Sequence, residues 1–167
     1  MLKSHELLGF MSPPLATEII EYLFESDKPS YRATLNAVAE ARKLRPVFLE
    51  RQARTERHAT MLGTLTRPQL DQVAAILLRT WLVKKHTAML IAFLDALAIP
   101  HDAGVVEDLP ASVDDAKLQL AVAGLLEKFP AEVVAVYLNA FNDMNEANWP
   151  NLKTLLESDA RLQLGAH

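Results

Sequence analysis

The chain has 167 residues, no cysteine and a formal net charge of −4. The absence of cysteine excludes disulfide bonds, thiol catalysis and cysteine-ligated metal sites. A hydrophobic fraction of 50% with 23% charged residues is typical of a soluble globular protein. Because Glu6 comes early and the apolar runs are short, the sequence predicts neither a signal peptide nor a membrane span. We therefore expect one cytoplasmic domain over residues 1–167, with no membrane contact.

Start signals divide the first part of the chain into helices. Ser12 followed by proline marks one start, and the apolar residues behind it follow the 3.6-residue period of a helix. Three helices are expected, over residues 12–26, 31–44 and 46–65. In the third, Val47 and Phe48 fall on the same predicted inner face as His58.

The stretch that follows predicts a long central helix from Pro68 to Ala98. It contains no glycine and no proline after its first residue, and its apolar side chains occupy nearly every face. A continuous helix of this kind would be about 45 Å long, and a break near Lys84 and Lys85 is the alternative. Because such a helix must be covered on all sides, either the other helices surround it or a second copy of the chain completes it as a homodimer.

The last third begins with a loop over residues 100–111 and continues with three more helical patterns. No segment alternates like a strand. The sequence therefore predicts an all-α, single-domain bundle of about seven or eight helices around the central one. Weak similarity among the tetrads that begin at Leu35, Leu94 and Leu138 leaves irregular helical-hairpin repeats as an alternative.

Charge is distributed unevenly along the chain. Residues 28–85 hold 12 Lys and Arg against 4 Asp and Glu, and residues 86–167 hold 4 against 12. One interpretation is a single fold with mixed surface charge. The other is a basic face that binds an acidic partner, formed by Arg42, Arg45, Arg51, Arg54 and Arg57. Interrupting glutamates and few aromatics argue against nucleic acid as that partner.

Several kinds of catalytic site are excluded by inspection. The five scattered glycines form no phosphate-binding loop, and no serine lies in a nucleophile elbow. His58 and His86 each precede a methionine by three residues, which would suit a soft metal. Alternatively, the methionine fills the core and the histidine hydrogen-bonds to a neighbour.

The loop over residues 100–111 is the best candidate for chemistry, because it is long and rich in carboxylates that could hold a divalent cation. Its segment His101-Asp102-Ala103-Gly104 resembles the His-Asp pair of the HD-domain metal-dependent phosphohydrolases. That resemblance implies a divalent metal bound by His101 and Asp102, with His58 or His86 upstream and Asp143 or Asp159 downstream. Pro100 predicts a loop for the pair, whereas the family carries it on a helix.

Taken together, the sequence favours a non-catalytic protein–protein interaction or adaptor module with no cofactor. Its predicted partner is another protein or a second copy of the chain, and its predicted contact surface is the basic face. The alternative is a metal-dependent phosphohydrolase centred on His101 and Asp102, with His58 and Asp159 as further ligands.

Overall fold

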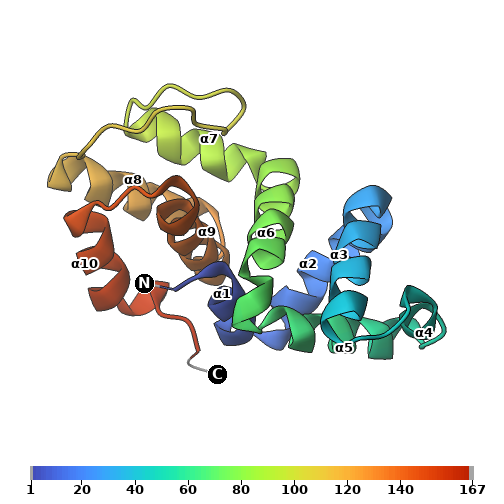
Figure 1. The fold of residues 1–167 in the computed structure, drawn as a ribbon. Helices are drawn as coiled ribbons and strands as arrows, with labels where there is room; N and C mark the ends of the chain where they lie inside the picture. The colour runs from blue at the N-terminus through green and yellow to red at the C-terminus, as the bar shows by residue number, and fades with distance from the viewer. Residues whose placement is uncertain (1, 166–167) are drawn as a thin grey trace. The chain divides into compact units, whose positions relative to one another are not determined.

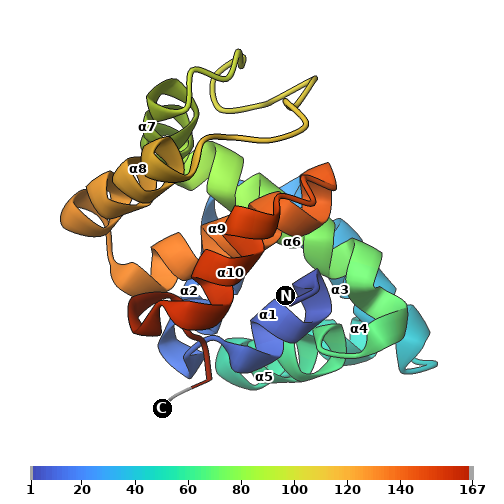
Figure 2. The same cartoon turned by 90° about the vertical axis from the view of Figure 1, so that its left-hand side faces the viewer.

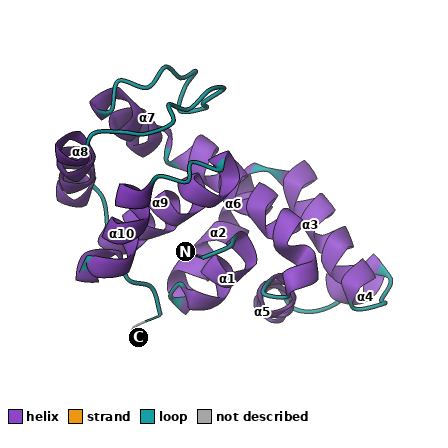
Figure 3. Cartoon of the chain, turned by 60° about the vertical axis from the view of Figure 1, so that its left-hand side comes forward, coloured by secondary structure: helices purple, strands orange, loops and turns teal. Residues whose placement is uncertain are grey.

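The computed structural model describes residues 2–165, and these residues form helices and loops without a single strand (Figure 3). The helices are α1 (Ser4–Phe10), α2 (Pro13–Ser26), α3 (Lys28–Ala41), α4 (Pro46–Glu50), α5 (Arg54–Leu65), η1 (Pro68–Leu70), α6 (Asp71–Lys85), α7 (Thr87–Ala96), α8 (Asp115–Lys128), α9 (Ala131–Asn145), α10 (Pro150–Ser158) and η2 (Ala160–Leu162), where η marks a 3₁₀ helix. The all-α helical bundle is confirmed, and ten α-helices in the described residues exceed the seven or eight expected. None of these helices is long and apolar enough to cross a bilayer.

Two compact units can be distinguished within this all-α domain: an N-terminal unit of residues 3–81 and a C-terminal unit that includes residues 82–165. In the N-terminal unit α2, α3 and α5 pack against one another, and α1 packs on α5 (Figure 1). Helix α2 begins at the predicted cap, where Ser12 Oγ accepts the Leu15 N–H at 3.4 Å. Its apolar stripe is buried, at Leu15, Ala16, Ile19, Ile20 and Leu23.

In the C-terminal unit α7 lies beside α8, and α9 contacts α8, α10 and η2 (Figure 2). Every residue of α9 from 133 to 142 is buried, so α9 is the helix that its neighbours surround. Aromatic rings meet edge to face around it: the Phe93 centroid lies 5.5 Å from Tyr137 and 5.3 Å from Phe141. Such pairs add about 1 kcal/mol each beyond the area that they bury.

The predicted long central helix is wrong. Residues 68–98 form η1, α6 and α7, and the chain leaves helical geometry at His86, where φ is −112° and ψ is 31°. Next to this break the Thr87 hydroxyl donates to the Val83 carbonyl, and such back-bonding bends helices. Lys84 and Lys85 lie in the last turn of α6, where positive charge favours a helix end. The alternative of a break near these lysines was therefore the better prediction.

The single helix expected over residues 46–65 is also wrong, because α4 stops at Glu50 and α5 begins at Arg54. No glycine or proline marks this break, and Ala53 takes an extended conformation ahead of α5. As a result α4 is one short turn. Leu49 is its only buried residue, at 1% exposure, while Val47 and Phe48 lie on the surface. The alternative arrangement of irregular helical-hairpin repeats, which the sequence left open, stays a prediction.

Candidate functional site

The predicted metal ligand His101 lies in the loop between α7 and α8, which we call the strap (residues 97–114). Its Nε2 lies 2.7 Å from Asp95 Oδ1, and its Nδ1 accepts the Gly104 N–H at 3.1 Å. Both ring nitrogens are therefore occupied within the C-terminal unit. Asp102 is exposed, and its backbone pairs with Val105 in an isolated bridge.

The strap packs against the rest of the C-terminal unit near its middle and towards its C-terminal end. Gly104 has φ +88°, and a Cβ there would lie 2.8 Å from Leu90 Cβ. Farther along, Trp149 Nε1 donates to the Pro110 carbonyl at 3.0 Å, and Asn151 Nδ2 donates to the Val113 carbonyl at 2.8 Å. The carboxylates of the strap border a pocket of about 370 Å³ lined by Pro100, His101, Asp102, Val105, Glu107 and Asp108.

Asp159, the predicted downstream ligand, is engaged by Arg161. The guanidinium donates from Nε to Oδ1 at 3.1 Å and from Nη2 to Oδ2 at 2.8 Å, and these hydrogen bonds lower the pKa of Asp159. Such bidentate geometry is a strong form of carboxylate binding. Among residues 2–165, no three histidine or carboxylate side chains gather closely enough to hold a metal ion.

His58, the predicted upstream ligand, belongs to a hydrogen-bonded cluster in the N-terminal unit. Its side chain is 2% exposed. Nδ1 lies 2.8 Å from Glu21 Oε1 on α2, and Nε2 lies 2.8 Å from the Tyr31 hydroxyl on α3. Of the two interpretations of the histidine that precedes a methionine by three residues, core packing therefore describes His58 better than a soft-metal site does. Met61 is buried in the core, and the imidazole hydrogen-bonds to its neighbours.

Two arginines extend this cluster. Arg57 Nε donates to the Tyr31 hydroxyl at 2.8 Å, and Arg54 pairs with Glu21 and, at 3.0 Å, with Glu25. Glu21, Tyr31, Arg54, Arg57 and His58 form what we call the His58 network. The Phe24 ring lies beside it, with the Arg54 Cζ 4.2 Å from its centroid.

The arrangement of carboxylate, imidazole and hydroxyl invites comparison with a nucleophilic triad, but the chemistry does not support it. A nucleophile must lose its proton readily. Burial instead raises the pKa of Tyr31, although Arg57 donates to its oxygen. Burial also lowers the pKa of His58, and Glu21 offsets this only in part. Burial alone would raise the pKa of Glu21, but Arg54 and His58 outweigh it and lower that pKa. The network is a set of matched structural hydrogen bonds.

The five arginines of the predicted basic face fall into two groups. Arg54 and Arg57 belong to the His58 network, and the Arg42 Nη1 donates to Thr64 Oγ1 at 3.3 Å. Arg45 and Arg51, at the two ends of α4, are exposed. The Arg51 Cζ lies 6.0 Å from the centre of the Phe48 ring. No hydrogen bond or ion pair engages either of these two guanidinium groups among residues 2–165.

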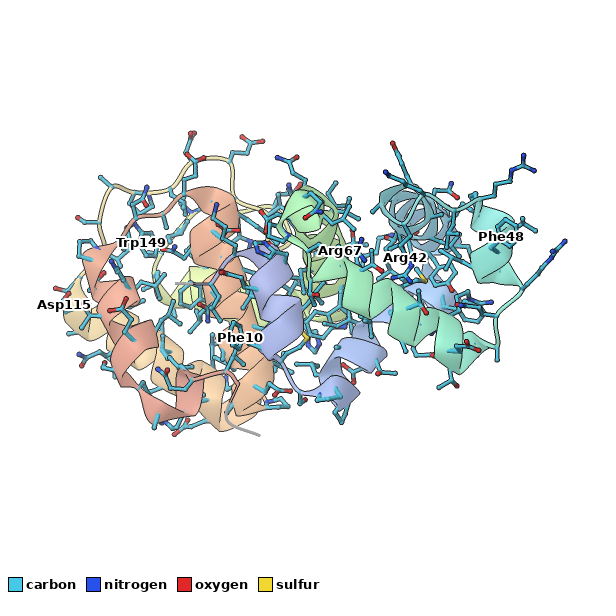
Figure 4. The ribbon with its side chains drawn as sticks, turned by 60° about the horizontal axis from the view of Figure 1, so that its bottom comes forward. Phe10, Arg42, Phe48, Arg67, Asp115 and Trp149 are labelled. Carbon is cyan, nitrogen blue, oxygen red and sulfur yellow. The ribbon has the colours of Figure 1, made fainter. Side chains whose placement is uncertain are left out.

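Large apolar side chains are exposed beside these arginines. Leu44 is 40% exposed, Val47 39% and Phe48 51%, and Phe48 lies on α4, the short helix at the right-hand end of Figure 4. Three of the six large apolar side chains exposed in the described residues thus lie within five positions. We call Leu44, Arg45, Val47, Phe48 and Arg51 the α4 patch.

The local sequence explains why α4 presents these residues. Helix α3 ends at Ala41, and two residues later Lys43 takes the left-handed conformation, at φ 56°. The Leu44 N–H then reaches back to the Ala39 carbonyl at 2.8 Å. Pro46 then starts α4. Sequence reasoning found the arginines but missed the apolar half of the patch, because it extended one amphipathic helix through residues 51–53. No glycine or proline between Pro46 and Arg54 could have indicated the break.

The comparisons with known proteins identify no relative. Neither a protein-family model nor a curated protein nor a solved structure matches this chain.

Proposed function

We propose that the protein is a non-catalytic interaction module that binds an acidic segment of a partner protein through the α4 patch. The observation that carries this proposal is the exposure of three large apolar side chains within five residues, next to two exposed arginines. Aromatic residues and arginine are enriched at the centres of protein interfaces, where they contribute most of the binding energy. Exposed apolar side chains that cluster in this way, rather than occurring singly, are typical of protein interaction sites.

The composition of the patch defines the chemistry of the partner. Arg45 and Arg51 favour carboxylates on the partner, because guanidinium groups bind them with matched geometry. Phe48 and Val47 favour an apolar side chain between those carboxylates. A surface of this size supports a transient contact rather than a permanent complex.

Selection from a random peptide display library on the immobilised protein tests this proposal. We expect enriched peptides in which acidic residues flank an aliphatic or aromatic residue. Fluorescence anisotropy should then show that Phe48→Ser weakens binding of such a peptide by roughly tenfold or more. Ile76→Ser is the matched control, since Ile76 is also exposed, at 64%, but lies on α6. This control should leave the affinity unchanged.

Two further measurements make the test decisive. Arg51→Glu should reduce the affinity and the salt dependence together, because one attractive charge pair becomes repulsive. Peptides that lack acidic residues, or that bind wild type and Phe48→Ser equally, would contradict the proposal. Concentration-dependent sedimentation of the wild type that Phe48→Ser abolishes would identify the acidic partner as a second copy of the chain.

A further inference from the structure

The hydrogen bonds of the His58 network have one consistent set of donors and acceptors. The Glu21 carboxylate can only accept, so His58 Nδ1 must carry the proton that it donates. Arg57 can only donate, so the Tyr31 oxygen accepts from Arg57 Nε and the Tyr31 O–H points to His58 Nε2. Each of these hydrogen bonds then has one donor and one acceptor, and the imidazole is neutral.

The network continues from Tyr31 to the end of α4. Arg57 uses Nε for the Tyr31 hydroxyl, and its Nη1 reaches the carbonyl oxygen of Glu50, the last residue of α4, at 3.5 Å. The Glu50 carboxylate pairs with Arg32 on α3. A helix of one turn has few bonds of its own, and its last carbonyls lack partners within the helix. The position of α4 therefore depends on contacts such as the one from Arg57.

A proton added to His58 disturbs this pattern. Nε2 becomes a donor, so the Tyr31 oxygen faces two donors and its own hydrogen loses its acceptor. The charges that act on His58 are Glu21 from α2 and Arg54 and Arg57 from its own helix, with Tyr31 as the titratable neighbour from α3. Glu21 favours the imidazolium, but its other oxygen already binds Arg54. Arg57 is only half-buried, so it is free to relieve the conflict by moving away from Tyr31 and, with it, from the Glu50 carbonyl.

We propose that the His58 network is a proton-sensitive latch on the α4 patch: protonation of His58 displaces Arg57, releases the end of α4 and loosens the patch. This inference rests on the proposed function for its purpose, since it describes how acid would regulate that binding surface. The latch closes when the imidazole is neutral. It opens as the pH falls below the ordinary histidine value of 6.5, because burial lowers the pKa of His58.

Amide hydrogen exchange without any partner tests the latch, with the imidazole carbon resonances followed in parallel. The reporters are the Arg51 and Gln52 amides, which bond to the carbonyls of Val47 and Leu49 at 3.0 and 3.1 Å. After correction for the intrinsic effect of pH, we expect their protection to fall roughly tenfold from about pH 7.5 to a pH at which the imidazole resonances show His58 to be protonated. The amides of α8, in the C-terminal unit, provide the internal reference.

Two variants separate the steps. His58→Gln keeps a neutral donor and acceptor, so α4 protection should become independent of pH. Arg57→Gln leaves the imidazole free to titrate but cuts its link to α4, so protection should be low at both pH values. The latch is refuted if wild-type α4 keeps its protection while the His58 resonance titrates, or if His58→Gln responds to acid like wild type. Because no peptide is used, a failed display selection would leave this result interpretable.

Discussion

The two histidines that the sequence nominated as metal ligands occupy contrasting surroundings. His58 and His101 each use both ring nitrogens, and each has a carboxylate oxygen within 2.8 Å. The His58 side chain is 2% exposed and Glu21 30%, whereas Asp95, the partner of His101, is 66% exposed. Loss of a hydrogen bond should therefore lower the free energy of unfolding more at His58 than at His101. Water can replace a lost partner at the strap but not at the buried imidazole of the N-terminal unit.

The largest effect should come from removing the buried imidazole. His58→Ala removes one hydrogen-bond partner each from the Glu21 carboxylate and the Tyr31 hydroxyl and leaves a cavity in the core, and we expect it to cost about 3 kcal/mol of unfolding free energy. His101→Ala should cost less than about 1 kcal/mol, since Asp95 is largely in water. Urea unfolding followed by circular dichroism measures both. Equal losses in the two variants would mean that burial does not distinguish the two sites.

The next effect concerns the strap, where packing rather than polarity is critical. Gly104→Ala should cost about 1–3 kcal/mol, because its Cβ would clash with Leu90 and its φ of +88° disfavours a side chain. Gly124→Ala is the matched control in the same unit: nothing lies within 4 Å of the added Cβ, and alanine favours the helix. Thermal unfolding should show a gain of about 0.5–1 kcal/mol for Gly124→Ala. Destabilisation of both variants to the same extent would contradict the close fit of the strap on α7.

The same contrast shows what the sequence could and could not reveal. The all-α fold, the cap at Ser12 and the loop after α7 follow from local signals, because caps, prolines and periodicity act within a few residues. The His58 network does not, since Glu21 and Tyr31 lie 37 and 27 residues from His58. The break at residues 51–53 also lacks a local signal. It depends on Leu49 being buried and on Arg57 reaching Glu50, which only the packed helices define.

Acid should weaken the N-terminal unit by a smaller amount than His58→Ala does, because protonation removes no side chain from the core and the Glu21 carboxylate can still bond to the imidazolium. The pKa of His58 is lowered in the folded state, so the unfolded chain binds a proton first and stability falls as the pH drops below 6.5. The pKa of Glu21 is also lowered, and its contribution is lost at still lower pH, below 4.5. Urea unfolding at a series of pH values measures this loss. His58→Gln should remove the loss of stability below pH 6.5 and keep the loss below pH 4.5. If the loss below pH 6.5 persists in this variant, a group other than His58 causes it.

The smallest predicted effect lies where α7 ends and the strap begins. Ala98 has φ 55°, and the Ile99 N–H reaches back to the Leu94 carbonyl at 2.9 Å, as in a helix end that normally takes glycine. Ala98→Gly should therefore stabilise the protein by up to about 1 kcal/mol, because the exposed methyl group contributes little and the left-handed backbone becomes relaxed. Ala96→Gly, two residues earlier in helical geometry, should destabilise by about 0.5–1 kcal/mol. Opposite signs for two identical substitutions in one thermal unfolding series would show that backbone conformation, rather than loss of a methyl group, determines stability at this end of the strap.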